Sequence, residues 1–193
     1  MDRLEAGLRD RLIDVGVELV TSGGTAAVSL REIARRAGVS HGAPRRYFPT
    51  HLELLSAVAR RGFAHLAAKL GEAAAGSAEH PRSRLAALSR AYLDFAASNR
   101  GMYELMFRHD LLESSRLGLR EVSLPLFRMV TTLVADAQPP AGAAPEVVAG
   151  ALWANLHGIA QLWQWGSLQL ATELRDPEPL LRAALEAHLG PGR

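Results

Sequence analysis

The chain has 193 residues, of which 48% are hydrophobic and 22% are charged, as expected for a globular protein that buries a sizeable core. It contains no cysteine, which excludes disulfide bonds, thiol redox chemistry and cysteine-ligated metal sites. The formal net charge is only +2, so any strongly basic segment must be balanced by net acidic charge elsewhere.

The N-terminal segment predicts an amphipathic helix that ends at Gly23 and Gly24. Its first residues are charged and lack the apolar core of a secretion signal, so we expect a cytoplasmic protein. The apolar positions recur at helical spacing and should face a core. They are Leu4, Leu8, Leu12, Val15 and Leu19.

The next segment predicts two short helices joined by a tight turn. Ser29 and Glu32 have the spacing of a capping box, in which the hydroxyl and the carboxylate each satisfy a free amide at the helix start. Gly38 suits the left-handed position that ends this helix. Ser40 can then cap the second helix through its side chain.

The second helix must be short, because Pro49 cannot continue it. Phe48 is its expected anchor in the core. Thr50 and Glu53 form a second capping box, which should open a long helix that runs to about Ala75.

Residues 29–51 carry five arginines against one glutamate, a local charge of +4. A basic patch confined to one motif is typical of phosphate binding. A solvated arginine-rich helix face would give the same charge, but it would not need two capping boxes and a turn of this length. The combination predicts a helix-turn-helix, in which the second helix enters the major groove of DNA.

Residues from about 8 to 55 resemble the N-terminal domain of the tetracycline-repressor (TetR) family, through the stretches SLREIARRAGVS, HGAPRRYFPT and HLELL. The resemblance implies an all-α, dimeric transcriptional regulator, usually a repressor that a small ligand releases from DNA. It also implies a three-helix DNA-binding domain over residues 1–50, followed by a helical ligand-binding and dimerisation domain over residues 51–193.

Two positions depart from the family pattern. Arg45 stands where an aromatic residue is usual, and Pro44 stands where a bulky aliphatic residue is usual. Because Pro44 removes an amide and crowds the carbonyl of Ser40, we expect the second helix to begin a residue or two late, or with a tighter turn. The register of its base contacts stays open.

The predicted partner is a pseudo-palindromic operator in double-stranded DNA. Arg45 and Arg46 are the candidates for contact with guanine edges or phosphates, and His41 and Ala43 lie nearer the helix tip. The resemblance matches five residues to positions that often touch phosphate, namely Ser29, Ser40, Tyr47, Thr50 and His51. Arg31 and Gly42 complete the predicted DNA-binding set.

The rest of the chain also predicts helices, over residues 85–96 and 114–137, the second with Pro125 as a kink. Residues 147–172 carry no charge over a length that could span a membrane. Scattered polar side chains argue against a span, because hydrocarbon would leave them without partners. A single helix apolar on two faces, one of them toward a second subunit, is the better reading.

A final helix is expected with Asp176 as its cap and Pro177 at its first position. Together with the uncharged helix it would form the homodimer interface of the resembled family. The predicted interface residues are Leu156, Trp163, Leu181 and Leu185. The pattern Trp153-x-x-x-His157-Gly158 also resembles a subset of the family with a Trp-His-Gly signature in its C-terminal domain.

The sequence gives little support for an enzyme. No His-x-x-x-His pair or other spaced set of metal ligands occurs, and His109-Asp110 reads as a surface turn rather than a catalytic pair. We therefore expect no catalytic residue, no metal and no cofactor.

Aromatic and methionine side chains are frequent after the DNA motif, and they favour a small, mostly apolar ligand. His157 itself reads first as a core histidine. The predicted ligand-binding residues are Tyr92, Phe95, Met102, Tyr103, Met106, Phe107, Trp153 and His157. The alternative function is an architectural DNA-binding protein without a small-molecule sensor.

Overall fold

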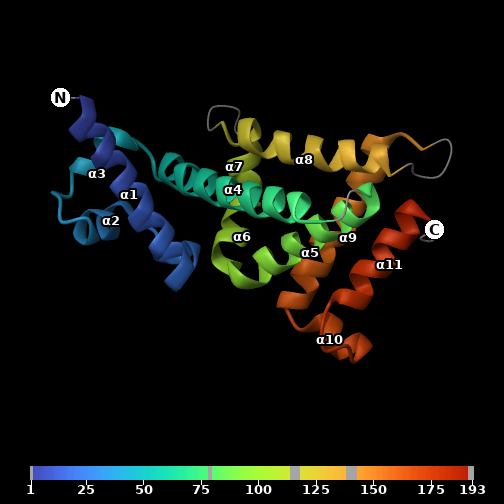
Figure 1. The fold of residues 1–193 in the computed structure, drawn as a ribbon. Helices are drawn as coiled ribbons and strands as arrows, with labels where there is room; N and C mark the ends of the chain where they lie inside the picture. The colour runs from blue at the N-terminus through green and yellow to red at the C-terminus, as the bar shows by residue number, and fades with distance from the viewer. Residues whose placement is uncertain (1, 78–79, 114–117, 138–142, 191–193) are drawn as a thin grey trace. The chain divides into compact units, whose positions relative to one another are not determined.

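The computed structural model describes residues 2–77, 80–113, 118–137 and 143–190, and over these ranges it contains helices and no strand. The all-α prediction is therefore confirmed. The helices are α1 (Asp2–Gly23), the 3₁₀ helix η1 (Thr25–Ala27), α2 (Leu30–Arg36), α3 (Ala43–Tyr47), α4 (His51–Ala75), α5 (Pro81–Ser98), α6 (Arg100–Met106), α7 (His109–Glu113), α8 (Leu119–Asp136), α9 (Pro145–Gln164), α10 (Ser167–Thr172) and α11 (Glu178–Leu189) (Figure 1).

The chain forms two compact units, each made of two segments of the sequence. Unit 1 comprises residues 1–65 and 99–123, and unit 2 comprises residues 66–98 and 124–193. The long helix α4 runs from one unit into the other. Unit 1 is larger than the expected DNA-binding domain because α6 returns to pack on α1 and η1.

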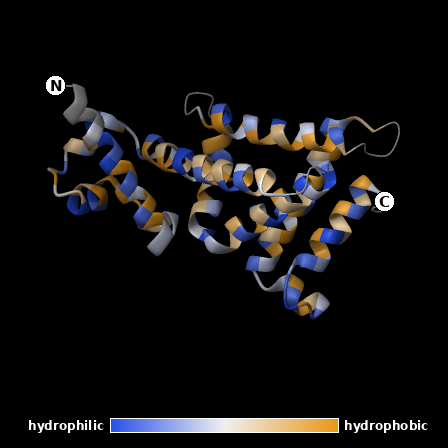
Figure 2. Ribbon diagram, viewed as in Figure 1, coloured by the Kyte–Doolittle hydropathy of each residue, from blue (hydrophilic) through white to orange (hydrophobic). Residues whose placement is uncertain are grey.

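In unit 1 the amphipathic pattern of α1 produces the core. Leu12, Leu19, Ile33 and Phe48 are almost completely buried, so α2 and the end of α3 are anchored on α1. Figure 2 shows hydrophobic and hydrophilic residues alternating along α1, as one buried and one solvated face require.

The return of α6 depends on a close backbone approach. A Cβ added at Gly101 would lie 2.5 Å from the carbonyl oxygen of Val20, so only glycine fits there. The Tyr103 and Phe63 rings each lie against Phe107, with centroids 5.0 and 5.7 Å away.

Unit 2 contains α5, α9, α10 and α11 together with most of α8 and the C-terminal part of α4. Within it, α9 contacts α5, α10 and α11. Leu85, Leu88, Leu152 and Leu181 form part of its buried core. An ion pair between Arg90 of α5 and Glu178 fixes the start of α11 at the surface.

The single uncharged helix expected over residues 147–172 is a wrong prediction, because the segment is broken in two. Gly166 has φ +76°, a left-handed conformation that interrupts the helix between α9 and α10. The helix α11 begins one residue later than expected, with the Asp176 carboxylate accepting from the Glu178 amide at 3.0 Å.

Some predicted features are partly outside the described ranges. The helix expected from residue 114 is described only from residue 118, and α8 contains Pro125 within its length. Among the described residues, no helix is both long and apolar enough to cross a membrane.

Candidate functional site

The first helix of the predicted DNA motif begins as expected, but its capping glutamate has a different role. The Ser29 hydroxyl accepts a hydrogen bond from the Glu32 amide at 3.2 Å, which caps α2. The Glu32 carboxylate binds Arg35 through two hydrogen bonds, of 2.8 and 2.6 Å, and binds the Arg36 Nε at 3.0 Å. Only the serine half of the predicted capping box is therefore formed, and the Glu32 carboxylate instead accepts hydrogen bonds from Arg35 and Arg36.

The turn after α2 is a Schellman motif. Gly38 has φ +67°, its amide donates to the Arg35 carbonyl at 3.3 Å, and the Val39 amide donates to the Ala34 carbonyl at 3.0 Å. These bonds satisfy the last carbonyls of α2 and turn the chain toward α3. The expectation for Gly38 is confirmed.

The second helix, α3, is the recognition helix of the motif and spans only Ala43–Tyr47. Gly42, not Ser40, occupies its N-cap position, and no side chain caps it; the Ser40 carbonyl accepts from the Ala43 amide at 3.0 Å. Side-chain capping by Ser40 is thus a wrong prediction. The late start follows from Pro44, which lies buried at the second helical position, where its missing amide costs nothing.

The end of α3 is held from both sides. Phe48 is 2% exposed and forms the expected core anchor, with the Arg9 guanidinium 5.5 Å from its ring centroid. Thr50 and Glu53 form a complete capping box at the start of α4, with the two reciprocal bonds at 3.1 and 3.2 Å. The His51 ring bonds to the Val28 carbonyl at 2.7 Å, which ties α4 to the residue before α2.

The exposed side chains of this motif carry its positive charge. Arg31, Arg45 and Arg46 are exposed, as are Ser29, Ser40, His41, Gly42, Thr50 and His51, while Ala43 and Tyr47 are half-buried. Neither Arg45 nor Arg46 takes part in the ion pairs of the described part of the chain. All eleven predicted DNA-binding residues thus lie on one short stretch between Ser29 and His51, in which α2 and α4 have side-chain caps and α3 has none.

The eight predicted ligand-binding residues fall into two groups, one in each unit. Unit 1 holds Met102, Tyr103 and Met106, all buried, with Phe107 half-buried beside them. Unit 2 holds the other four, Tyr92, Phe95, Trp153 and His157.

The group in unit 2 combines apolar rings with polar atoms. The Tyr92 hydroxyl and the His157 Nδ1 are 2.9 Å apart, and the Trp153 and His157 rings lie 5.7 Å apart between centroids. Burial lowers the pKa of His157 from its usual value, so the ring is held neutral at neutral pH. Tyr92 and Phe95 are buried, whereas Trp153 is 40% exposed, so the group extends from the core to the surface of unit 2.

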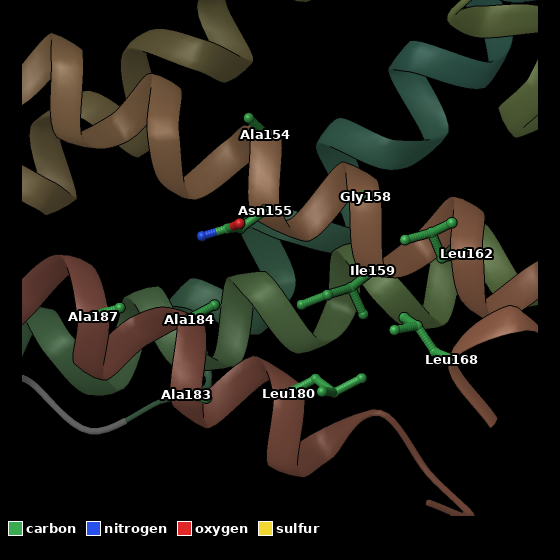
Figure 3. Close-up of a pocket in the computed structure, with 10 residues that line it drawn as sticks. All are labelled: Ala154, Asn155, Gly158, Ile159, Leu162, Leu168, Leu180, Ala183, Ala184 and Ala187. Atoms are coloured by element: carbon green, nitrogen blue, oxygen red, sulfur yellow. The ribbon is translucent and has the colours of Figure 1, made fainter. Parts of the chain in front are cut away.

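A hollow of about 370 Å³ opens between α9 and α11 (Figure 3). None of the eight predicted ligand residues lines it. Its lining is apolar apart from Asn155 and consists mainly of small side chains: Ala154, Asn155, Gly158, Ile159, Leu162, Leu168, Leu180, Ala183, Ala184 and Ala187.

The residues predicted for the dimer interface do not line the hollow between α9 and α11. Leu156, Leu181 and Leu185 are at most 5% exposed within the single chain, and Trp163 is half-buried. They pack α9 and α11 onto the rest of unit 2, because they share the helix faces that make its core. The sequence analysis missed the two small residues Ala154 and Gly158, which lie one turn apart on the side of α9 opposite to Leu156 and line the hollow.

Nothing in the described ranges groups three or more potential metal ligands. The pair His109-Asp110 begins α7 rather than forming a turn, and Asp110 accepts from Arg108 at 2.6 Å. That ion pair lowers the pKa of Asp110 and gives its carboxylate a structural partner.

Family models match most of the chain. Residues 12–58 match the bacterial regulatory proteins of the tetR family, and residues 85–188 match the tetracyclin repressor-like C-terminal domain. Over 75 residues the chain is 37% identical to the HTH-type transcriptional repressor KstR of Mycolicibacterium smegmatis. That match covers 38% of this chain and 37% of the relative, so the chain spans little more than a third of the curated relative that it matches.

Solved structures extend the similarity over nearly the full length. A protein of unknown function from Rhodococcus sp. RHA1 is 30% identical with a TM-score of 0.79, covering 93% of this chain and 92% of its own. The multidrug binding protein EbrR, solved with imidazole, is 27% identical with a TM-score of 0.60, covering 96% of each chain. The chain therefore belongs to the tetracycline-repressor family of DNA-binding transcription regulators, which are not enzymes.

Proposed function

We propose that this protein is a ligand-responsive repressor that acts in the cytoplasm and binds a pseudo-palindromic operator as a homodimer. The observation that carries the proposal is the capped helix-turn-helix with two unpaired, exposed arginines on α3. Arginine presents donors in a planar fork that matches the O6 and N7 acceptors of guanine, and each such pair contributes roughly 1–3 kcal/mol of base discrimination.

The DNA contacts divide into two kinds. Arg45 and Arg46 read bases or hold phosphates from α3, and the hydroxyls of Ser29, Ser40 and Thr50 bind the phosphate backbone of the DNA. Phosphate contacts fix the register without reading sequence, so specificity depends on the α3 arginines.

The test is selection of bound DNA from a random pool, followed by binding measurements with the selected site. We expect a two-fold symmetric site with half-sites about one helical turn (~34–36 Å) or more apart. Arg45→Ala combined with Arg46→Ala should abolish the preference for that site and leave the helical content unchanged. Unchanged affinity and preference in the double variant would remove α3 as the reading element.

The homodimer is proposed from the hollow between α9 and α11. Small side chains such as Ala154, Gly158 and Ala183 let helices of a second copy approach closely, and Leu162, 39% exposed, supplies apolar surface at its edge. A stable pairing needs about 800 Å² per partner, which two helices of this length can provide.

The same change, from leucine to glutamate, at two positions tests the dimer. Leu162→Glu should produce monomers in light scattering, because it buries a charge without a partner. Leu170→Glu is the control, since Leu170 is 87% exposed on α10 and does not line the hollow. A wild-type protein that is monomeric at micromolar concentration would contradict the proposal.

The ligand site is proposed at the group of Tyr92, Trp153 and His157 in unit 2. These residues combine apolar rings with a few polar atoms, a lining that suits a small aromatic ligand, with the Tyr92–His157 pair setting its orientation. The structural relative EbrR, a multidrug binding protein, supports a ligand of this general class.

A thermal-shift screen with small aromatic compounds, imidazole among them, tests this site. A ligand at one hundred times its Kd stabilises the native state by about 2.7 kcal/mol. A compound that raises the melting temperature should also release the selected DNA, and Trp153→Ala should weaken both effects together. Release without any dependence on Trp153 would move the ligand site elsewhere, and no ligand at all would favour the architectural alternative.

A further inference from the structure

The five arginines of residues 29–51 are not equivalent. Arg45 and Arg46 on α3 stand outside the ion pairs of the described residues, whereas Arg35 and Arg36 on α2 share the carboxylate of Glu32. The local charge of +4 is thus divided between arginines that are free for DNA and arginines that already have a protein anion.

The geometry around Glu32 is that of a strong ion-pair cluster. One carboxylate oxygen accepts from the Arg35 Nη2 at 2.6 Å and from the Arg36 Nε at 3.0 Å, and the other accepts from the Arg35 Nε at 2.8 Å. The Arg35 contact is bidentate, the form in which arginine binds a carboxylate or a phosphate best. Hydrogen bonds from both arginines lower the pKa of Glu32 to about 2, so the carboxylate is ionised at any working pH.

The cluster is close to the surface where phosphate contacts are proposed. Arg31 and Arg35 are four residues apart on α2 and therefore share one face of the helix. Ser29 begins the same helix and is exposed. Without Glu32, the guanidinium of Arg35 would continue the row of donors formed by Ser29 and Arg31.

We propose that Glu32 withholds Arg35 and Arg36 from DNA phosphates and so lowers the affinity of this protein for DNA of any sequence. The inference rests on the proposed operator binding. A phosphate contact strengthens binding to every sequence equally, because the backbone carries no direct sequence information. By occupying two arginines of α2, Glu32 lowers the affinity for bulk DNA and leaves discrimination to Arg45 and Arg46.

The salt dependence of binding measures this effect directly. Each phosphate neutralised in a complex adds about −0.9 to the slope of log K against log salt. Glu32→Gln keeps the size of the side chain and removes the anion, so one or two arginines should gain phosphate contacts. We expect the slope on a duplex of scrambled sequence to steepen by about 0.9 to 1.8.

The change should strengthen binding to both duplexes and leave the selectivity unchanged. Each added contact strengthens binding at 50 mM salt, relative to 200 mM salt, by roughly 3-fold. Because both duplexes gain the same contacts, the preference for the selected operator over the scrambled duplex should stay equal to that of the wild type.

Glu104→Gln is the matched control. Glu104 pairs with Arg100 at 3.0 Å on α6, outside the DNA motif, and the substitution changes the net charge of the protein by the same amount. It should leave the slope unchanged. The combined variant Glu32→Gln, Arg35→Gln, Arg36→Gln should return the slope to the wild-type value.

The outcomes separate this inference from the proposed function. If the wild-type protein selects no DNA site, the proposed function is wrong, and the inference about Glu32 fails with it. If the wild type binds its site but Glu32→Gln leaves the slope unchanged, or weakens binding to both duplexes, then Glu32 positions the helix instead and the inference is overturned. Circular dichroism of each variant shows whether α2 remains folded.

Discussion

In the turn between α2 and α3, the addition of one Cβ atom at Gly38 should have a clear effect on stability. Gly38 has φ +67°, and a Cβ added there would meet nothing within 4 Å. Gly38→Ala therefore creates no clash, and its whole cost is the left-handed backbone, which is about 1–2 kcal/mol for a residue with a Cβ. For a chain of this size, each kcal/mol corresponds to roughly 2–4 °C in melting temperature.

The matched control is Gly7→Ala in the same unit. Gly7 is exposed within α1, and an added Cβ there also meets nothing within 4 Å. Because glycine inside a helix is less favourable than alanine by roughly 0.5–1 kcal/mol, this change should be neutral or stabilising. Urea unfolding followed by circular dichroism measures both. If Gly38→Ala is as stable as Gly7→Ala, the left-handed turn is not required.

Two further predictions concern packing and pH. Gly101→Ala should cost about 1–3 kcal/mol through overpacking, since the new Cβ meets the Val20 backbone carbonyl. Gly62→Ala should cost less, because its new Cβ meets only the flexible side chains of Met102 and Met106, and equal losses in the two variants would contradict this reasoning. Burial lowers the folded-state pKa of His157 from its ordinary 6.5, so the unfolded chain binds the proton more readily and stability is lost as the pH falls from about 6.5 toward the folded-state value. The melting temperature of His157→Phe should therefore fall less on acidification than that of the wild type, and an identical fall in both would refute it.

Features that depend on neighbours in sequence were predictable from the sequence. Ser29, Gly38 and the Thr50–Glu53 pair each act on amides or carbonyls within a few residues, and the structure confirms all three. The length of α4 follows from the same local rules.

Features that depend on a choice between partners were not predictable. Glu32 could have accepted from the Ser29 amide, but the arginines three and four residues later are charged donors and give a stronger bond. Position 166 was read as helical from hydrophobic periodicity, although a glycine can also leave the helix, and there it does.

The extent of unit 1 depends on contacts between distant parts of the chain, which local patterns do not show. The contact of α6 with α1 brings together residues about eighty positions apart in the sequence, and the periodic pattern of neither helix predicts this contact. In the same way, the apolar pattern of residues 147–172 predicted a helix with two buried faces, but it could not show which face packs in the core of the chain. Burial of Leu156 and Leu181 inside the chain leaves the small-residue side for a partner.

The shortness of α3 limits what one copy of this protein can read. Only five residues form the helix, Pro44 among them is buried, and Arg45 and Arg46 are its exposed charged side chains. Two bidentate contacts with guanine would contribute roughly 2–6 kcal/mol of discrimination. Specific sites are usually preferred over bulk DNA by about 4–10 kcal/mol. The discrimination from a single recognition helix lies at the lower end of this range. Two copies on a symmetric site would double it and cover the range without any further kind of contact. Additional phosphate contacts from Arg35 or Arg36 would raise both affinities together and leave the difference unchanged. The proposed symmetric dimer would instead add selectivity by doubling the base contacts of Arg45 and Arg46.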